Sequence, residues 1–426
     1  MLREIRKTET KQLRAYLDSR NTDISNDVLL KVNEIIREVK ENGDSALIKY
    51  TLQFDGVQLS SFRVSQEEID TAASQCSPAF VKAMEKAAEN IIAFHEKQKV
   101  NSYLFEKKDG VYMGERVIPL AVVGIYVPGG RAQYPSSVLM NALPAKIAGV
   151  ERIVMVTPPS KDGSIRPEIA LAAKLAGIDE IYTAGGAQAI AALACGTESI
   201  PKVDKITGPG NIYVAAAKKL VYGICDIDMI AGPSEILVIA DGDADPVYIA
   251  ADLLSQAEHD PMASAIFLTT QRRLLDEVNK ELDKQLAVLP KRDIASVSIR
   301  DYGTAIICDT VDECIDFANA IAPEHLELMI KEPMTKLNRV RNAGSVFLGY
   351  YTCESIGDYY GGTNHVLPTG GTARFSSALG VDAFVKRSCY LHYSEEALQK
   401  DGENIIVLAE EEDLSGHANA VRVRML

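Results

Sequence analysis

Apolar residues recur at helical spacing over the first hundred residues of the chain. In the segment VLLKVNEIIREVKENG, residues 28–43, apolar positions return every three or four residues, and Gly43 is a typical residue to end a helix. A second such segment runs from Glu67 toward His95. Because this spacing places apolar side chains along one face of a helix, we predict that residues 26–99 are helical.

From about residue 117 the pattern changes to short apolar runs that alternate with alanine-rich helical segments. Runs such as VIPLAVVGIYV and RIVMVT resemble buried strands, and segments such as PEIALAAKLAG resemble helices. The alternation resumes after AGPSE with ILVIA, SAIFLTT, TAIICD and SVFLG. Strands that alternate with helices build parallel sheets. The sequence therefore predicts an α/β fold of two tandem Rossmann-like parallel-sheet domains, with a helical N-terminal segment and a C-terminal tail.

The domain limits follow from these changes of pattern, with a boundary near residue 234 that no linker marks. We expect an N-terminal helical arm over residues 1–22 and a charged helical tail over residues 379–426, which caps the core or reaches a partner subunit. A first, discontinuous α/β domain takes residues 23–120 and 235–378, and a second takes residues 121–234.

Composition narrows the classes of function. A net charge of -14 without a long Lys/Arg cluster argues against a nucleic-acid partner. The start MLREIRKTET lacks an apolar signal region, and no apolar run approaches the ~18 residues of a membrane span, so we expect a cytoplasmic protein without membrane contact. Seven scattered cysteines without a CxxC motif argue against a disulfide framework and a thiolate metal site.

Three glycine-bearing loops each follow a predicted strand and open a predicted helix. They are VPGG at 127–130, AGGAQ at 184–188 and GPGN at 208–211. At the carboxyl ends of parallel strands such loops offer unpaired backbone N–H groups to phosphates, so a nucleotide or dinucleotide is expected there. A single loop of this kind is equally typical of a tight turn, and GxGxxG is absent; the prediction therefore depends on finding three in one domain.

Four of the six histidines lie in short polar motifs: QAEHD, APEHLEL, GDYYGGTNH and EEEDLSGH. Gln256 and His259 are three residues apart on a predicted helix, so their side chains lie one turn apart on one face and are suited to share a cation. The alternative is a solvent-facing helix end. With Asp358 and His417 they would make an oxygen and nitrogen shell suited to zinc or a similar divalent ion, although no spacing rule brings the four together.

The Glu324-His325 pair is a candidate for proton transfer. Histidine titrates near neutrality and suits general-base catalysis, and a glutamate can orient or deprotonate water. Such dipeptides are also common on surfaces, but here an apolar strand, LELMI, follows and anchors the pair in a core. His95 and His392 have no polar company, and we expect them to be packing or surface residues.

Taken together, these motifs resemble the histidinol dehydrogenase family from YVPGG to the C-terminus. The specific stretches are GGAQAIAALACGTESIPKVDKITGPGN, DMIAGPSEILVIAD, DLLSQAEHD, APEHLEL, AGSVFLG and GDYYGGTNHVLPT. The one visible departure is Cys353, where proline is more usual in the family; it lies five residues before Asp358 and concerns only the stiffness of that loop.

The resemblance implies a four-electron oxidation of L-histidinol, through L-histidinaldehyde, to L-histidine with two NAD+ and one Zn2+ per subunit, the last step of histidine biosynthesis. It also implies a homodimer in which the C-terminal segment acts in the neighbouring subunit's site. Carried over by motif, the residues are as follows: catalytic Glu324 and His325; metal ligands Gln256, His259, Asp358 and His417; substrate contacts Ser234, Gln256, His259, His325, Asp358, His365, Glu412 and His417; and NAD contacts Tyr126, Gln188 and Asn211.

Four other functions compete with this interpretation. A related enzyme that oxidises another alcohol, such as a sulfonated diol, is disfavoured by Glu412 and His365. A zinc hydrolase would leave the three glycine loops unexplained, and HExxH is absent. A thiol-based aldehyde dehydrogenase would need an activated cysteine beside a base, which no motif offers. A non-catalytic binding protein would not be expected to keep the whole polar set.

Overall fold

The computed structural model describes residues 1–5, 24–129 and 134–425. These residues form two compact units, one of residues 1–98 and 121–384 and the other of residues 99–120 and 385–426. Among them, no helix is both long and apolar enough to cross a membrane. The larger unit contains two parallel sheets, which confirms the predicted α/β class.

One sheet of the larger unit has five parallel strands in the order β6-β5-β4-β7-β8. The chain adds β5 and β6 on one side of β4 and then β7 and β8 on the other, so the order reverses between β4 and β7. In open α/β sheets, ligands bind at the carboxyl ends of the strands at such a point. The strands are β4 (Val122–Tyr126), β5 (Arg152–Thr157), β6 (Glu180–Thr183), β7 (Lys205–Thr207) and β8 (Asp226–Ile227), and the helices between them are α5 (Pro135–Ala148), α6 (Pro167–Leu175), α7 (Gly186–Cys195) and α8 (Ile212–Val221).

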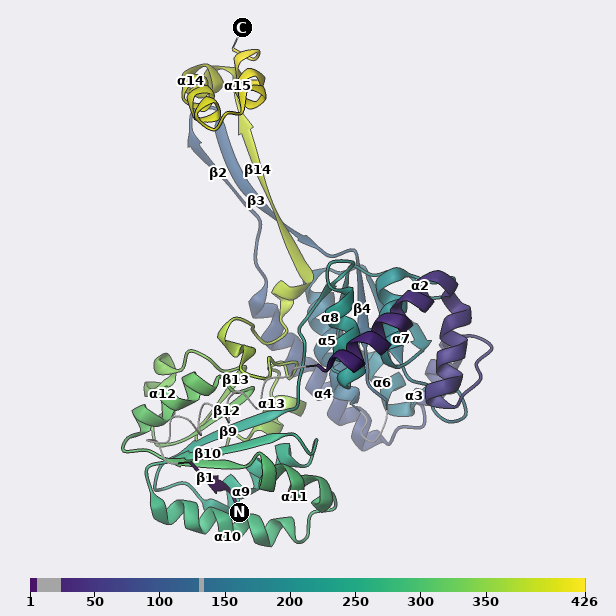
Figure 1. Ribbon diagram of the computed structural model, residues 1–426, viewed down its shortest axis with the longest axis vertical. Coiled ribbons are helices and arrows are strands. Elements are labelled where there is room, and N and C mark those ends of the chain that lie inside the picture. Colours follow the sequence, from purple (N-terminus) through teal and green to yellow (C-terminus); the bar gives the residue numbers. More distant parts are fainter. Residues whose placement is uncertain (6–23, 130–133, 426) are drawn as a thin grey trace. The chain divides into compact units, whose positions relative to one another are not determined.

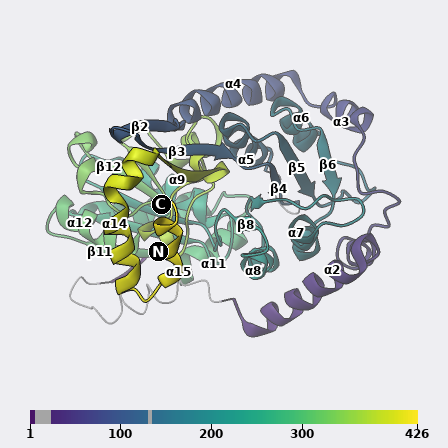
Figure 2. The same cartoon turned by 90° about the horizontal axis from the view of Figure 1, so that it is seen from above.

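Helices from the first hundred residues cover this five-stranded sheet (Figure 2). They are α2 (Asn26–Asp55), α3 (Gln66–Ala73) and α4 (Pro78–His95). Helix α2 packs on α7 and α8, whereas α3 and α4 pack on α6 and α5. Gly43, with φ 52°, kinks α2 where the sequence predicts a helix end. These helices, which the sequence assigned to a domain of residues 23–120 plus 235–378, thus pack on the helices that flank the five-stranded sheet.

The second sheet of the larger unit has six parallel strands in the order β1-β11-β10-β9-β12-β13. Helices α9, α10 and α11 bury one face of the sheet, and α12 covers the other (Figure 1). The strands are β1 (Arg3–Glu4), β9 (Glu235–Ala240), β10 (Ser264–Thr269), β11 (Thr304–Ile307), β12 (His325–Met329) and β13 (Ser345–Leu348), and the helices are α9 (Pro246–Ala257), α10 (Arg272–Leu286), α11 (Arg292–Asp301), α12 (Val311–Ile321) and α13 (Glu354–Tyr359).

The N-terminal arm predicted over residues 1–22 is helical in none of its described residues. Arg3 and Glu4 form the edge strand β1, which pairs with β11, and residues 6–22 lie outside the described part of the chain. Short 3-10 helices also occur in the larger unit, at Glu96–Gln98, Pro333–Thr335, Leu337–Arg339, Thr372–Arg374 and Val381–Phe384.

The smaller unit is an antiparallel sheet with two helices, which differs from the predicted helical tail of residues 379–426. Its strands are β2 (Tyr103–Lys108), β3 (Val111–Pro119) and β14 (Val385–Tyr393), in the order β14-β3-β2, and its helices are α14 (Glu395–Glu411) and α15 (Ser415–Arg422). Strand β14 pairs with β3 along its whole length. This pairing places residues 99–120 with the C-terminal segment, whereas the sequence assigned them to the first α/β domain.

Candidate active site

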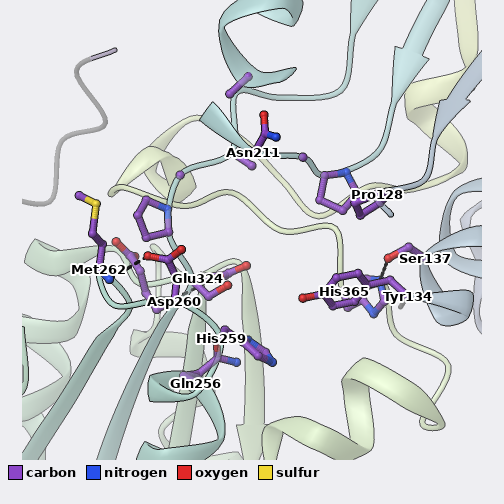
Figure 3. Close-up of a pocket in the computed structure, with 18 of the residues that line it drawn as sticks. Pro128, Tyr134, Ser137, Asn211, Gln256, His259, Asp260, Met262, Glu324 and His365 are labelled. Atoms are coloured by element: carbon purple, nitrogen blue, oxygen red, sulfur yellow. Dashed lines mark hydrogen bonds between the residues drawn. The ribbon is translucent and has the colours of Figure 1, made fainter. Parts of the chain in front are cut away.

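A pocket of about 660 Å³ in the larger unit brings together most of the polar motifs found in the sequence (Figure 3). Its walls come from the carboxyl ends of β4 and β7 in the five-stranded sheet and from the amino ends of β9, β10 and β12 in the six-stranded sheet. The volume suits a small molecule. Among the lining residues are Pro128, Tyr134, Ser137, Asn211, Ser234, Gln256, His259, Asp260, Met262, Glu324, His325, Asp358 and His365.

Glu324 and His325 lie at the start of β12 and are almost fully buried, with 7% and 3% of their surfaces exposed. The Glu324 carboxylate accepts a hydrogen bond from the Glu235 N–H at 2.8 Å. Burial raises the pKa of Glu324 to about 8, although the nearby His325 opposes this. A buried carboxyl group with a pKa near the working pH is suited to take up and release a proton.

The protonation of His325 follows from its neighbours. Its Nδ1 lies 3.0 Å from the carbonyl oxygen of Glu235, which only accepts, so Nδ1 carries a proton. Nε2 faces the pocket and donates a second proton to the Asp358 carboxylate, with 3.3 Å between Nε2 and Oδ1. Burial favours the neutral ring, but Glu324 and Asp358 more than offset it and raise the pKa of His325 well above its usual value. The ring atom that exchanges a proton with the pocket is therefore Nε2.

Gln256 and His259 lie together at the end of α9, as their spacing predicts. Gln256 Oε1 is 3.2 Å from His259 Nδ1, and Gln256 is completely buried. Its Nε2 has no hydrogen-bond partner among the described residues. If the amide is turned over, Nε2 donates to His259 and the carbonyl oxygen takes the other position, near the Glu354 carboxyl group, where it can bind a cation.

These donors fit a divalent cation in part. Burial lowers the pKa of His259, so its ring stays neutral as a metal ligand must. Asp358, on α13, lines the same pocket and supplies a carboxylate. No group of three or more His, Cys, Asp and Glu side chains in the described residues is placed to hold a metal ion. The predicted zinc ligands include a glutamine amide, which is not one of these four residue types, and they need a further donor. The finding is therefore compatible with the predicted ligand set.

His417 and Glu412, the remaining predicted ligand and substrate contact, belong to the smaller unit. His417 lies on α15 and Glu412 ends α14, and both are exposed. Neither lines the pocket in the described part of the chain. Their roles in the metal and substrate sites stay predictions.

His365 lines the pocket, but both of its ring nitrogens already have protein partners. Nδ1 donates to the Asp358 carbonyl at 2.8 Å, so Nε2 accepts from the Ser137 hydroxyl at 3.1 Å (Figure 3). Burial lowers the pKa of His365 and keeps the ring neutral. This geometry makes His365 a link between α5 and α13. Its contact with substrate stays a prediction.

The three glycine loops follow β4, β6 and β7 at one edge of the same sheet, as predicted for their described residues. Asn211 begins α8, lines the pocket and accepts hydrogen bonds from Tyr213 N and Val214 N. Tyr126 and Gln188 do not line it: Tyr126 is buried and its hydroxyl accepts from Gly186 N at 3.2 Å, and Gln188 is buried in α7. Gly130, in the first loop, lies outside the described residues.

Several residues at the site were not predicted from the sequence. Ser137 follows a proline at the start of α5, and Tyr134, Asp260 and Met262 line the pocket. Ser234, which was predicted, lies just before β9 and also lines it. His95 is a buried packing residue, as expected: Nδ1 donates to Ile91 O and Nε2 accepts from the Asn364 amide. All seven cysteines are free.

Comparison with known proteins gives a consistent result. The family model described as histidinol dehydrogenase matches residues 18–425. The histidinol dehydrogenase of Listeria monocytogenes is 56% identical over 404 residues, covering 95% of this chain and 94% of the relative, and that of Bacillus cereus is 57% identical over 401 residues, covering 94% and 93%. A crystal structure of histidinol dehydrogenase from Elizabethkingia anophelis matches with a TM-score of 0.95 at 41% identity and covers 100% of this chain and 98% of that one. The chain therefore belongs to the histidinol dehydrogenase family.

Proposed function

We propose that this protein oxidises L-histidinol through L-histidinaldehyde to L-histidine, the last step of histidine biosynthesis. Two NAD+ each accept one hydride, and one water supplies the second carboxylate oxygen. The observation that carries the proposal is the buried Glu324-His325 pair, which lies in one pocket with Gln256, His259 and Asp358. Such a pocket supplies a base, a water-activating carboxyl group and a place for a polar substrate.

We assign His325 Nε2 as the base for the first oxidation. Once Nε2 has released its own proton, it takes the hydroxyl proton of the alcohol while hydride leaves for the nicotinamide, because Nδ1 is already committed to Glu235 O. Glu324, once ionised, takes a proton from the water that attacks the aldehyde. His325 then assists loss of the second hydride from the hydrate. The fixed ring of His325 is thus used twice.

We assign Gln256, His259 and Asp358 as ligands of one Zn2+, with His417 as the fourth. When bound, the ion would hold the imidazole and amino nitrogens of the substrate, which an open coordination position allows. Ser234, His365 and Glu412 are the further proposed substrate contacts. Tyr126, Gln188 and Asn211 are the proposed NAD contacts.

We also propose a homodimer in which the C-terminal segment completes the neighbouring site. Glu412 and His417 are both exposed in the smaller unit, as groups that serve another subunit would have to be before association. Of the competing functions, oxidation of another alcohol such as a sulfonated diol remains the nearest alternative.

The proposal is tested with purified, zinc-loaded protein, L-histidinol and NAD+, followed by the absorbance of NADH. A sulfonated diol is assayed at the same concentration under the same conditions. We expect turnover of histidinol with a kcat/KM far above that for the diol. Oxidation of the diol without turnover of histidinol would contradict the substrate assignment and leave the reaction class intact.

A further inference from the structure

Gly208 starts the loop Gly208–Asn211 and occupies a position that only glycine can take. Its φ is +115°, and a Cβ there would lie 2.0 Å from the carbonyl oxygen of Tyr126. The loop that follows β7 thus passes directly against the backbone at the end of β4, at the point where the strand order reverses. A small displacement of Gly208 therefore changes the shape of the predicted cofactor loop.

A buried ion pair holds both polar groups of Gly208. Lys218, on α8, and Asp228, just after β8, form this pair, and their side chains are only 3% and 1% exposed. Lys218 Nζ donates to Gly208 O at 2.9 Å, and Gly208 N donates to Asp228 Oδ2 at 2.8 Å. The carbonyl and the amide of one glycine are thus bound to opposite charges.

Asp228 holds a second wall of the pocket as well. Its Oδ1 accepts a hydrogen bond from Met229 N at 2.6 Å. Met229 begins the segment that leads from β8 to β9, and residues 230–235 of this segment line the pocket. Neither Lys218 nor Asp228 lines the pocket itself. Any effect of the two side chains on ligand binding must therefore pass through the backbone of Gly208 and Met229.

Stability alone is a poor explanation for this pair. Removing two charges from water is costly, and well-packed apolar residues often replace a buried ion pair without loss of stability. The pair is better explained by the fixed position that it gives to the backbone amide and carbonyl of Gly208. The residues between Gly208 and α8, Pro209 to Asn211, all line the pocket.

We propose that Lys218 and Asp228 are positioning residues that set the affinity for NAD+ by fixing the loop of residues 208–211 and the start of the segment after β8. The proposal rests on the proposed function, because it takes NAD+ as the ligand of this loop. It names two residues outside the pocket that determine cofactor binding.

The test compares the double variant Lys218→Met/Asp228→Asn, which leaves no unpaired buried charge, with the control Lys219→Met/Asp243→Asn. The control makes the same two changes of residue type at positions that are both exposed. We expect the double variant to raise the KM and Kd for NAD+ by about tenfold or more, with the KM for histidinol within about twofold of wild type. The control should match wild type in both.

Hydrogen exchange of the Gly208 and Met229 amides, measured without NAD+ or substrate, gives an independent readout. We expect both amides to exchange at least about tenfold faster in the double variant than in the control, because their acceptor is weakened. Lys218→Gln/Asp228→Asn, which keeps polar side chains and also leaves no unpaired buried charge, serves if the first double variant does not fold. Unchanged exchange, or faster exchange with unchanged affinity for NAD+ in a folded variant, would overturn the proposal. If wild-type protein does not bind NAD+, the proposed function fails, and the exchange data still show whether the pair fixes the loop.

Discussion

At the residue scale, the site depends on burial that changes the protonation of ordinary side chains. Glu324 is an unremarkable carboxylic acid in water, but burial raises its pKa to about 8. His325 keeps a proton on Nδ1 because a backbone carbonyl 90 residues away in the chain accepts it. The chemistry assigned to the pair follows from these surroundings and not from the residue types alone.

The raised pKa of Glu324 leads to a prediction for the second oxidation. Only the ionised carboxylate can accept a proton from water, so the rate of aldehyde oxidation should rise with pH through the pKa of Glu324, which is about 8 in the protein without metal. The pH profile of histidinaldehyde oxidation measures this. The rise should vanish in Glu324→Gln, and an identical rise in that variant would assign it to another group.

A second buried pair, Asp252 and Glu327, gives a prediction for stability. Their carboxyl groups interact in the core, and because Asp252 Oδ2 and Glu327 Oε2 have no other hydrogen-bond partner among the described residues, we expect them to share a proton. Burial raises the pKa of Asp252 to about 6, and Glu354 is the further carboxyl group near Glu327. A carboxyl group whose pKa is raised on folding stabilises the protein below its ordinary pKa, near 3.8, and loses that contribution as pH rises through about 6.

We therefore expect Asp252→Asn to be more stable relative to wild type at pH 8 than at pH 5, since its amide donates to Glu327 at every pH. Urea unfolding at the two pH values measures the difference. Asp243→Asn, an exposed position nearby, is the matched control and should show no such change. An Asp252→Asn variant that loses stability equally at both values would contradict a shared proton.

At the scale of elements, the sequence predicts where helices and strands lie along the chain. It is less informative about which end of a sheet carries the site. Periodicity correctly indicates strands after residue 117, whereas Gly43, which was predicted to end a helix, kinks α2 instead. It does not show that Glu324 and His325 lie at the amino ends of the six-stranded sheet, because that depends on strand order. Likewise the Ser137–His365 hydrogen bond joins residues 228 positions apart, and no local pattern records it.

Asn211 both caps helix α8 and lines the pocket, and two substitutions can separate these roles. Its side chain caps the helix, so Asn211→Ala should cost about 1 kcal/mol of stability. Asn211→Ser keeps the capping oxygen but loses the amide that faces the pocket, so we expect nearly full stability with a raised KM for NAD+. Thermal unfolding and steady-state kinetics on the two variants measure this. A serine variant with the wild-type KM would show that Asn211 is only a cap.

At the scale of the whole molecule, the sequence predicts which helices are amphipathic but not what they pack against. The helices of residues 26–95 pack on α5 to α8, which flank the sheet of residues 122–227, and their periodicity is the same whichever layer they cover. The sequence predicts a helix where strand β14 lies, because its exposed, mixed sequence carries no clear alternation. The fold class is therefore confirmed, whereas the grouping of elements into units differs from the sequence-based prediction.

The proposed exchange of C-terminal segments predicts complementation between inactive variants. In a mixture of Gln256→Ala and His417→Ala subunits, a hybrid dimer regenerates one intact site only if His417 acts in the neighbouring subunit. After joint refolding we expect about a quarter of wild-type activity, since half of the dimers are hybrids with one good site of two. A mixture of Gln256→Ala and His259→Ala is the control and should stay inactive. Equal inactivity of both mixtures would place His417 in its own subunit's site.

The central claim is that one buried pair, Glu324 and His325, serves both oxidations in the same pocket. The most direct test counts NADH formed per L-histidinol consumed by zinc-loaded wild type and by Glu324→Gln, with semicarbazide present to trap free aldehyde. We predict two NADH per histidinol for wild type. For the variant we predict one NADH, with histidinaldehyde trapped, because water is no longer activated. Two NADH per histidinol from the variant at the wild-type rate would contradict the claim.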